Sequence, residues 1–173
     1  MKKLLLLAAT ACAFQATPAP ALMNAMLESV QVSAASHGFA ADLSLARTEA
    51  IRRAGRVVLC KSADGERCTA SGPWSQGWIA FDDADGNGVR GREERIIVRE
   101  RAFARTLRAV GSFNSVHAVA FGPTGAAKFV GASAPSGALT VCRETFDRTQ
   151  GARVTFEAGK SPRLRSERDV ACA

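Results

Sequence analysis

The chain has 173 residues, of which 47% are hydrophobic and 23% charged, and its formal net charge is +7. This length fits one domain with a short appendage, and this composition excludes a wholly disordered chain. No apolar run reaches the ~18 to 20 residues that a membrane-spanning helix needs, and the two histidines exclude a histidine-rich metal site.

Residues 1–21 have the features of an export signal. Two lysines precede an apolar run over residues 4–14, and Ala19-Pro20-Ala21 offers a small-x-small cleavage site before Leu22. Ala11-Cys12-Ala13 is a second cleavage option. We therefore expect an exported protein, located in the periplasm or at the cell surface.

Export would place the cysteines in an oxidising compartment. Removal of the signal leaves four of them, which predicts two disulfides with three possible connectivities. We favour Cys60–Cys68, because the residues between them are typical of a turn, and Cys142–Cys172, which would attach the C-terminal tail to a strand. Metal binding is the alternative, but no CxxC occurs and the spacings fit no zinc site.

Residues 22–55 predict a helix that ends at Gly55. Apolar side chains recur at i, i+4, i+7 and i+11 and form one stripe, at Phe39, Leu43, Ala46 and Ala50. A glycine preceded by basic residues is typical of a helix C-terminus. The segment from Ser33 to Gly38 has weak helix propensity, so the periodic pattern begins after it.

Beyond Gly55 the pattern changes to short apolar runs separated by glycine and proline turns. It predicts strands over residues 56–60, 77–81, 95–99, 116–121, 127–130, 138–141, 153–157 and 163–165. One helix followed by antiparallel strands is an α+β plan, in which the helix covers one sheet face. We therefore divide the chain into an export signal (1–21), a helix (22–55) and a β-rich domain (56–173).

The positive charge is concentrated in the second half of the chain. Residues 22–94 hold 8 basic and 10 acidic side chains, whereas residues 95–173 hold 13 basic and 6 acidic ones. A basic cluster lies in the tail, at Lys160, Arg163, Arg165 and Arg168. Arg163 and Arg165 would point the same way on a strand, a spacing that lets guanidinium groups contact successive phosphates.

This tail is a candidate nucleic-acid interface, and further arginines would extend it if the fold brings them near: Arg99, Arg101, Arg105 and Arg108. The tail has no aromatic side chain for base stacking, which argues against sequence-specific recognition of single strands. A solvated basic face is the alternative interpretation.

Residues 83–94 match the EF-hand calcium loop D-x-[DN]-x-[DN]-G-x5-E. The candidate ligands are Asp83, Asp85, Asn87 and Glu94. The flanking segments read as strands, whereas an EF-hand needs helices, and the same residue types are typical of a hairpin turn. We favour the hairpin, keep calcium as an alternative, and expect no other cofactor.

Signals of enzymatic activity are absent from the sequence. It contains no GxSxG, HExxH or P-loop motif, and His37 and His117 have no catalytic partner at an informative spacing. We expect Trp74 and Trp78 to pack in the core. The sequence predicts a non-enzymatic protein and indicates no small-molecule substrate.

The run from Ala41 to Arg53 resembles the helix signature of the GspH/FimT pseudopilins. The family's order continues through Val57–Cys60, Trp74, Gly77–Phe81, Asp83, Asn87-Gly88, Phe121–Gly125, Leu139–Cys142 and Cys172. The resemblance implies a pilin-like domain that serves as a minor subunit of a type II secretion pseudopilus or a type IV pilus. Its partners would be other pseudopilin or pilin subunits.

Some members of this family carry a Gly-Arg-x-Arg tail and bind DNA during uptake. The corresponding tail here runs from Gly159 to Arg165, and the motif is displaced and partly substituted. The resemblance therefore makes DNA an alternative partner, in an exported DNA-binding protein. A calcium-stabilised secreted module is a third interpretation.

The N-terminus departs from the family. Its members begin with a leader ending in Gly, then Phe, a Glu five residues into the mature chain, and about twenty apolar residues that anchor the subunit in the inner membrane. Gly38-Phe39 is the comparable dipeptide here, but Leu43 occupies the Glu position and Asp42 interrupts the apolar run. Two interpretations stay open: a prepilin leader begins upstream, or the chain does not polymerise in the usual way.

Overall fold

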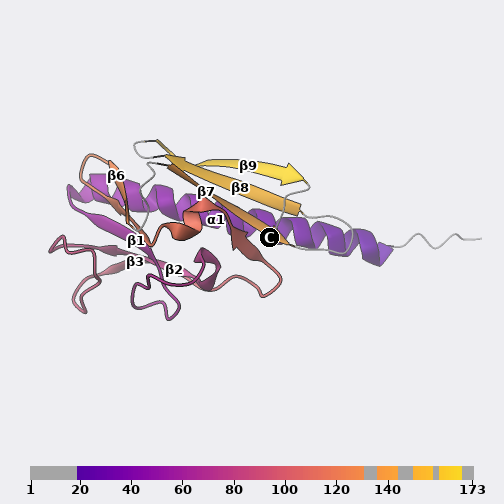
Figure 1. Cartoon of the computed structure of the whole chain (residues 1–173), viewed down its shortest axis with the longest axis horizontal. Coiled ribbons are helices and arrows are strands. Elements are labelled where there is room, and N and C mark those ends of the chain that lie inside the picture. Colours follow the sequence, from indigo (N-terminus) through magenta and orange to yellow (C-terminus); the bar gives the residue numbers. More distant parts are fainter. Residues whose placement is uncertain (1–18, 131–135, 144–149, 158–159, 169–173) are drawn as a thin grey trace, which may run out of the picture.

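Figure 1 presents the computed structural model, which describes residues 19–130, 136–143, 150–157 and 160–168. One long helix runs beside two antiparallel sheets. The five-stranded sheet has the order β3-β2-β1-β5-β6, and the four-stranded sheet has the order β4-β7-β8-β9. The predicted α+β class and the helix-on-sheet arrangement are confirmed.

Helix α1 extends from Ala19 to Arg53, so it begins before the predicted start and passes unbroken through the serine-rich segment. Proline is tolerated in the first turn of a helix, and Pro20 occupies that turn. The Ser36 hydroxyl donates a hydrogen bond of 2.7 Å to the Val32 carbonyl oxygen inside the helix. This local bond satisfies a buried polar group. Burial of Val32 and Phe39 on either side of it outweighs the low helix propensity.

The strands are β1 (Val57–Lys61), β2 (Trp78–Asp82), β3 (Ile96–Glu100), β4 (Arg108–Val110), β5 (Ala118–Phe121), β6 (Ala127–Val130), β7 (Ser136–Arg143), β8 (Gln150–Glu157) and β9 (Arg163–Arg168). Two short 3-10 helices lie at Trp74–Gln76 and Ser112–Ser115. The sequence pattern missed β4, which has three residues, and it predicted β7 and β8 too short.

Both sheets and the second part of α1 share one apolar core. The predicted stripe of Phe39, Leu43, Ala46 and Ala50 is fully buried in it. Phe39 lies at the centre, with ring centroids 5.2 Å from Trp74, 5.1 Å from Trp78 and 5.7 Å from Phe113. The expectation that both tryptophans belong to the core is confirmed, and Gly38-Phe39 lies inside the continuous helix α1.

The five-stranded sheet also buries part of its second face. A separate apolar cluster there contains Val58, Cys60, Ile79 and Phe81, and Cys68 packs against it. Residues on alternate positions of β1 therefore face two different cores, because side chains alternate along a strand. This explains why all five residues of the central strand β1 are buried.

Candidate functional site

The first part of α1 projects beyond the sheets, toward the end of the molecule opposite β6 (Figure 1). We call residues 19–31 the arm. The arm presents an exposed apolar stripe, with 56 to 70% of each side chain accessible, at Met23, Met26, Leu27 and Val30. Its spacing of i, i+3, i+4 and i+7 follows one face of a helix.

The arm stripe and the core stripe lie on opposite sides of the same helix. At 3.6 residues per turn, their mean directions around the helix axis differ by about 180°. The arm stripe is therefore not a continuation of the side that packs on the sheets. Sequence reasoning missed this surface, because it followed the helical periodicity only from Phe39 onward. The spacing of the arm stripe is nevertheless visible in the sequence.

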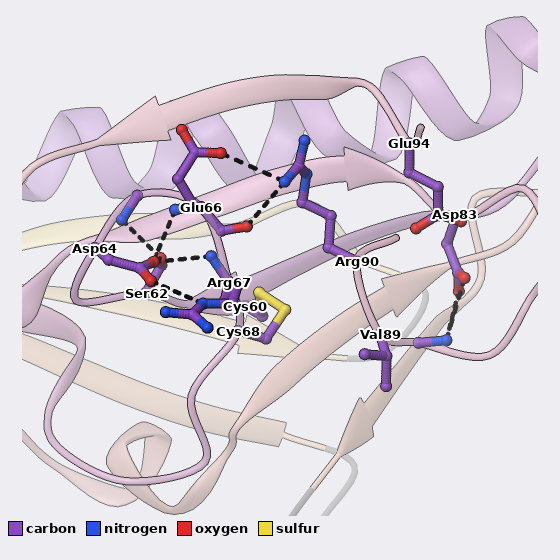
Figure 2. The surroundings of a disulfide bond; sticks show 12 residues. Cys60, Ser62, Asp64, Glu66, Arg67, Cys68, Asp83, Val89, Arg90 and Glu94 are labelled. Carbon is purple, nitrogen blue, oxygen red and sulfur yellow. Dashed lines mark hydrogen bonds and ion pairs between the residues drawn. A yellow bond between two sulfur atoms is a disulfide. The ribbon is translucent and has the colours of Figure 1, made fainter. Parts of the chain in front are cut away.

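The first predicted disulfide, Cys60–Cys68, is present, with an S–S distance of 2.04 Å (Figure 2). It closes a loop that is held internally by Asp64. One Asp64 carboxylate oxygen accepts hydrogen bonds of 2.8 Å from the backbone nitrogens of Glu66 and Arg67, and these bonds lower the pKa of Asp64. Sequence reasoning predicted the turn but not this carboxylate.

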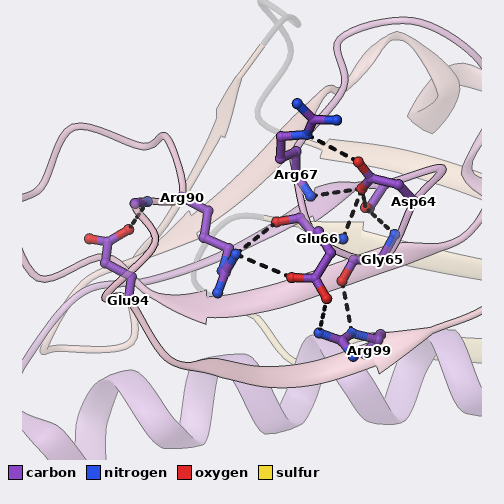
Figure 3. Close-up of polar contacts among 9 residues, drawn as sticks. Asp64, Gly65, Glu66, Arg67, Arg90, Glu94 and Arg99 are labelled. Atoms are coloured by element: carbon purple, nitrogen blue, oxygen red, sulfur yellow. Dashed lines mark hydrogen bonds and ion pairs between the residues drawn. The ribbon is translucent and has the colours of Figure 1, made fainter.

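Glu66 joins the disulfide loop to the β2–β3 region. Its carboxylate pairs with Arg99 of β3 at 2.5 Å and with Arg90 at 3.4 Å (Figure 3). Arg99 also donates a hydrogen bond of 2.8 Å to the Gly65 carbonyl oxygen, and Arg90 donates to the Glu66 carbonyl oxygen. The disulfide loop is thus attached at its two ends by the Cys60–Cys68 bond and at its middle by Gly65 and Glu66.

The candidate calcium ligands lie in the β2–β3 hairpin, whose flanking elements are strands rather than helices. The structure brings Asp83, Asp85 and Glu94 together, with one oxygen of each within 4.8 Å of the others. The fourth predicted ligand, Asn87, lies in the same loop, where its side-chain oxygen accepts a 2.6 Å bond from the Val89 nitrogen.

All three of these carboxylates already accept hydrogen bonds from backbone nitrogens of the loop, and for Asp85 the donor is Asn87. Gly88 donates to both oxygens of Asp83, and Glu94 accepts from the backbone nitrogens of Ala84 and Gly91. The buried Asp83 also pairs with Arg56 at 2.9 Å, and that guanidinium donates a 2.7 Å bond to the Gly86 carbonyl oxygen. A side-chain cation thus already lies against the loop, which agrees with the hairpin interpretation.

The basic tail forms the edge strand β9. Arg163 and Arg165 are exposed, and Arg165 lies directly opposite Arg153 of β8. Lys160 instead forms an ion pair with Glu157 three residues earlier. Arg168 is the last residue of β9. The sequence pattern missed Arg153, because only the β8–β9 register shows that it joins this face.

The other predicted arginines do not form one patch with the tail. Arg99 is on β3 of the five-stranded sheet, where it pairs with Glu66. Arg101 and Arg105 lie in the β3–β4 connection, and Arg108 is on β4, at the opposite edge of the sheet from β9. Among the side chains that the structure describes, the candidate interface contains Arg153, Arg163 and Arg165.

The remaining predicted sites are placed as follows. Cys142 is buried on β7 and disulfide-bonded, and its predicted partner Cys172 lies outside the described residues, so that pairing stays a prediction. His37 is exposed on α1, and His117 is half-buried next to β5. The export signal, apart from its last residues in α1, also lies outside the described part. Within that part, no helix has the length and apolar content of a membrane span.

A long helix packed on two antiparallel sheets, with a projecting N-terminal end, defines a pilin-like subunit. The match to protein families is more specific: residues 35–159 match the family described as type II transport protein GspH. The chain therefore belongs to the GspH family. It is a non-enzymatic component of a type II secretion or type IV pilus system and works in the periplasm or at the cell surface.

Solved structures show the same fold at low sequence identity. The type IV minor pilin FimU of Pseudomonas aeruginosa strain PAO1 is 19% identical, with a TM-score of 0.54 over 86% of this chain and 99% of that chain. The minor pseudopilin EpsH from the type 2 secretion system of Vibrio cholerae is 13% identical, with a TM-score of 0.52 over 79% and 97%. A comparison with curated proteins gives no significant match.

Proposed function

We propose that this chain is a minor-pilin-type subunit that joins an assembly of other pilin-like subunits through its arm. The observation that carries this proposal is the exposed stripe of Met23, Met26, Leu27 and Val30. Contiguous exposed apolar side chains are unfavourable in water and mark surfaces that associate with another apolar surface. The β-rich part would then form the head of the subunit, outside the helical contact.

Two features of the head fit such a role. Aromatic side chains pack around Phe39 in its core, and a disulfide and ion pairs stabilise its loops. A subunit exposed outside the cytoplasm benefits from cross-links that resist unfolding. The names of the similar structures include both a type IV minor pilin and a type 2 secretion pseudopilin, so both machines are candidates.

Replacement of Leu27 by Glu tests the arm. A charge in the middle of the stripe should prevent recovery of pilin-like subunits when the tagged protein is purified from its own host. Leu45→Glu is a matched control, because Leu45 is an exposed leucine that lies five helical turns along the same side of α1. Equal recovery with Leu27→Glu and wild type would reject the arm as the contact surface.

DNA binding is a second candidate function, favoured by the opposed pair of Arg153 and Arg165 with Arg163 on the same face. Like-charged side chains in register repel one another, so a polyanion across them would relieve the repulsion. Phosphate contacts would give binding that depends little on sequence and weakens steeply with salt.

The test is a titration of double-stranded DNA of unrelated sequences at several salt concentrations. Arg163→Ala/Arg165→Ala should weaken binding and lower the salt slope by about 0.9 for each phosphate that the variant no longer neutralises. Arg92→Ala/Lys128→Ala removes two exposed cations elsewhere and serves as the control. Equal weakening by both double variants would show that binding depends on the net charge of the protein and not on the Arg163–Arg165 surface.

A further inference from the structure

A groove of about 370 Å³ lies between α1 and the segment that connects β3 to β4. The helix contributes small residues to one wall: Ala34, Ala35 and Gly38. A side chain added at Gly38 would meet nothing within 4 Å, so the groove has open space at this point. The other wall is apolar and comes from Phe103 and Leu107, with Trp78 beside them.

Two carboxylates lie beside this aromatic wall. Glu100 lines the groove and is paired in register with Trp78 across β2 and β3. Asp42, from the next turns of α1, accepts a 2.9 Å hydrogen bond from the indole nitrogen of Trp78. Trp78 is further held by Phe103, at a centroid distance of 5.6 Å in an edge-on arrangement. An indole is thus fixed between two acidic groups.

Neither carboxylate is neutralised within the described part of the chain, where no lysine, arginine or histidine pairs with Asp42 or Glu100. The guanidinium of Arg143 donates a 3.0 Å hydrogen bond to Gln31, which lines the groove. Partial burial raises the pKa of Asp42, and burial together with the charge of Asp42 raises the pKa of Glu100. The two groups therefore disfavour each other's negative charge, and a nearby cation would stabilise both.

We propose that this groove receives an arginine or lysine side chain, flanked by apolar residues, from a neighbouring subunit of the assembly. The carboxylates would bind the cationic group, and the apolar walls would hold the flanking residues. Charge complementarity selects this occupant, because an apolar partner without a cation would leave both carboxylates next to a desolvating surface. The source of the side chain rests on the proposed assembly function.

The two indole resonances provide the readout, because both tryptophans are buried but only Trp78 lines the groove. Trp74 lies outside the groove and donates a 2.9 Å bond to the Phe113 carbonyl oxygen. The protein is titrated with the peptide acetyl-Leu-Arg-Leu-amide and with the same peptide carrying neutral citrulline in place of arginine. We expect a saturable shift of the Trp78 indole signal with the arginine peptide, a stationary Trp74 signal, and about tenfold weaker binding of the citrulline peptide, which lacks the charge that the carboxylates would bind.

Two variants should abolish the preference or the binding. Asp42→Asn/Glu100→Gln keeps an acceptor for Trp78 and should bind both peptides equally weakly. Gly38→Leu fills the open space without changing charge and should block both peptides. Glu93→Gln removes one exposed acidic group from the β2–β3 loop and is the charge control.

The proposal is overturned if neither peptide shifts the Trp78 signal, or if both peptides bind wild type with equal affinity. A shift produced by raising the protein concentration alone would also overturn it, since the occupant would then be a second copy of this chain. Failure here is distinguishable from failure of the arm: groove binding is measured on the isolated protein, whereas the arm is tested by recovery of subunits with Leu27→Glu.

Discussion

The two parts of helix α1 have the same regular backbone and opposite environments. From Val32 onward the helix buries an apolar stripe against both sheets, whereas the arm exposes its apolar stripe on the other side of the helix. Burial of apolar area stabilises the fold. Apolar area that stays exposed does not stabilise the fold, and its burial against another molecule would favour association. The comparison indicates that stability belongs to the head and association to the arm.

The largest expected effect comes from exchanging a large side chain in each part. Phe39→Ala should lower the free energy of unfolding by ~3 to 5 kcal/mol, because it leaves a cavity among three aromatic rings. Leu27→Ala should change it by less than about 0.5 kcal/mol, because the side chain is exposed. Urea unfolding of both variants measures this, and similar losses would contradict the division of roles.

Removal of the disulfide should affect the head without affecting the arm. Cys60→Ala/Cys68→Ala eliminates a cross-link between residues eight positions apart, both of which contact the second apolar cluster. We expect a decrease of ~2 to 3 kcal/mol in the free energy of unfolding. Recovery of partner subunits below the melting temperature should equal that of wild type, and a parallel decrease in stability and recovery would show that the two functions are coupled.

A smaller effect concerns the acid stability of the C-terminal end of α1. Glu49 accepts hydrogen bonds from Arg52 and Arg53, and these bonds lower its pKa from 4.5 to about 2. A carboxylate with a lowered pKa stabilises the folded state above its unfolded pKa, and this contribution is lost as the pH falls from about 4.5 to about 2. Glu49→Gln should therefore show a shallower fall in melting temperature over this range, and parallel curves would contradict this account.

The smallest expected effect is that of calcium. Carboxylates of the β2–β3 hairpin already accept hydrogen bonds from the loop, and Arg56 lies against Asp83. Added calcium should leave the melting temperature unchanged, and Asp83→Ala should lower it equally with and without the ion, because Arg56 loses its buried partner. A rise with calcium that Asp83→Ala removes would instead establish the calcium-stabilised module.

Sequence patterns predicted much of the head because they are local. The spacing of Phe39, Leu43, Ala46 and Ala50 follows the helical period, and the strands follow the alternation and turn residues of the chain. The Cys60–Cys68 bridge was predictable for the same reason, since its loop is short. The β4 strand was not, because three residues carry too little pattern and form a strand only by pairing with β7.

The candidate sites were less accessible to sequence reasoning, because they depend on contacts between distant segments. Arg153 joins Arg165 only through the β8–β9 register, and Glu66 meets Arg99 from 33 residues away. The predicted arginine patch was divided for this reason, with Arg99 and Arg108 in different sheets. Sequence reasoning also treated Asp42 as a departure from the family pattern, whereas the fold places it next to Trp78.

The sequence by itself determined the class of fold, the core side of α1, the disulfide loop and the family signature. These properties arise from residue types and spacings within single elements, where the periods of helix and strand decide which side chains share a face. The tertiary structure alone decided where α1 extends beyond the sheets, which arginines share a surface, and how Trp78 comes to lie next to both Asp42 and the groove that Glu100 lines. Those relations depend on packing and strand register, because they join residues that no local period connects.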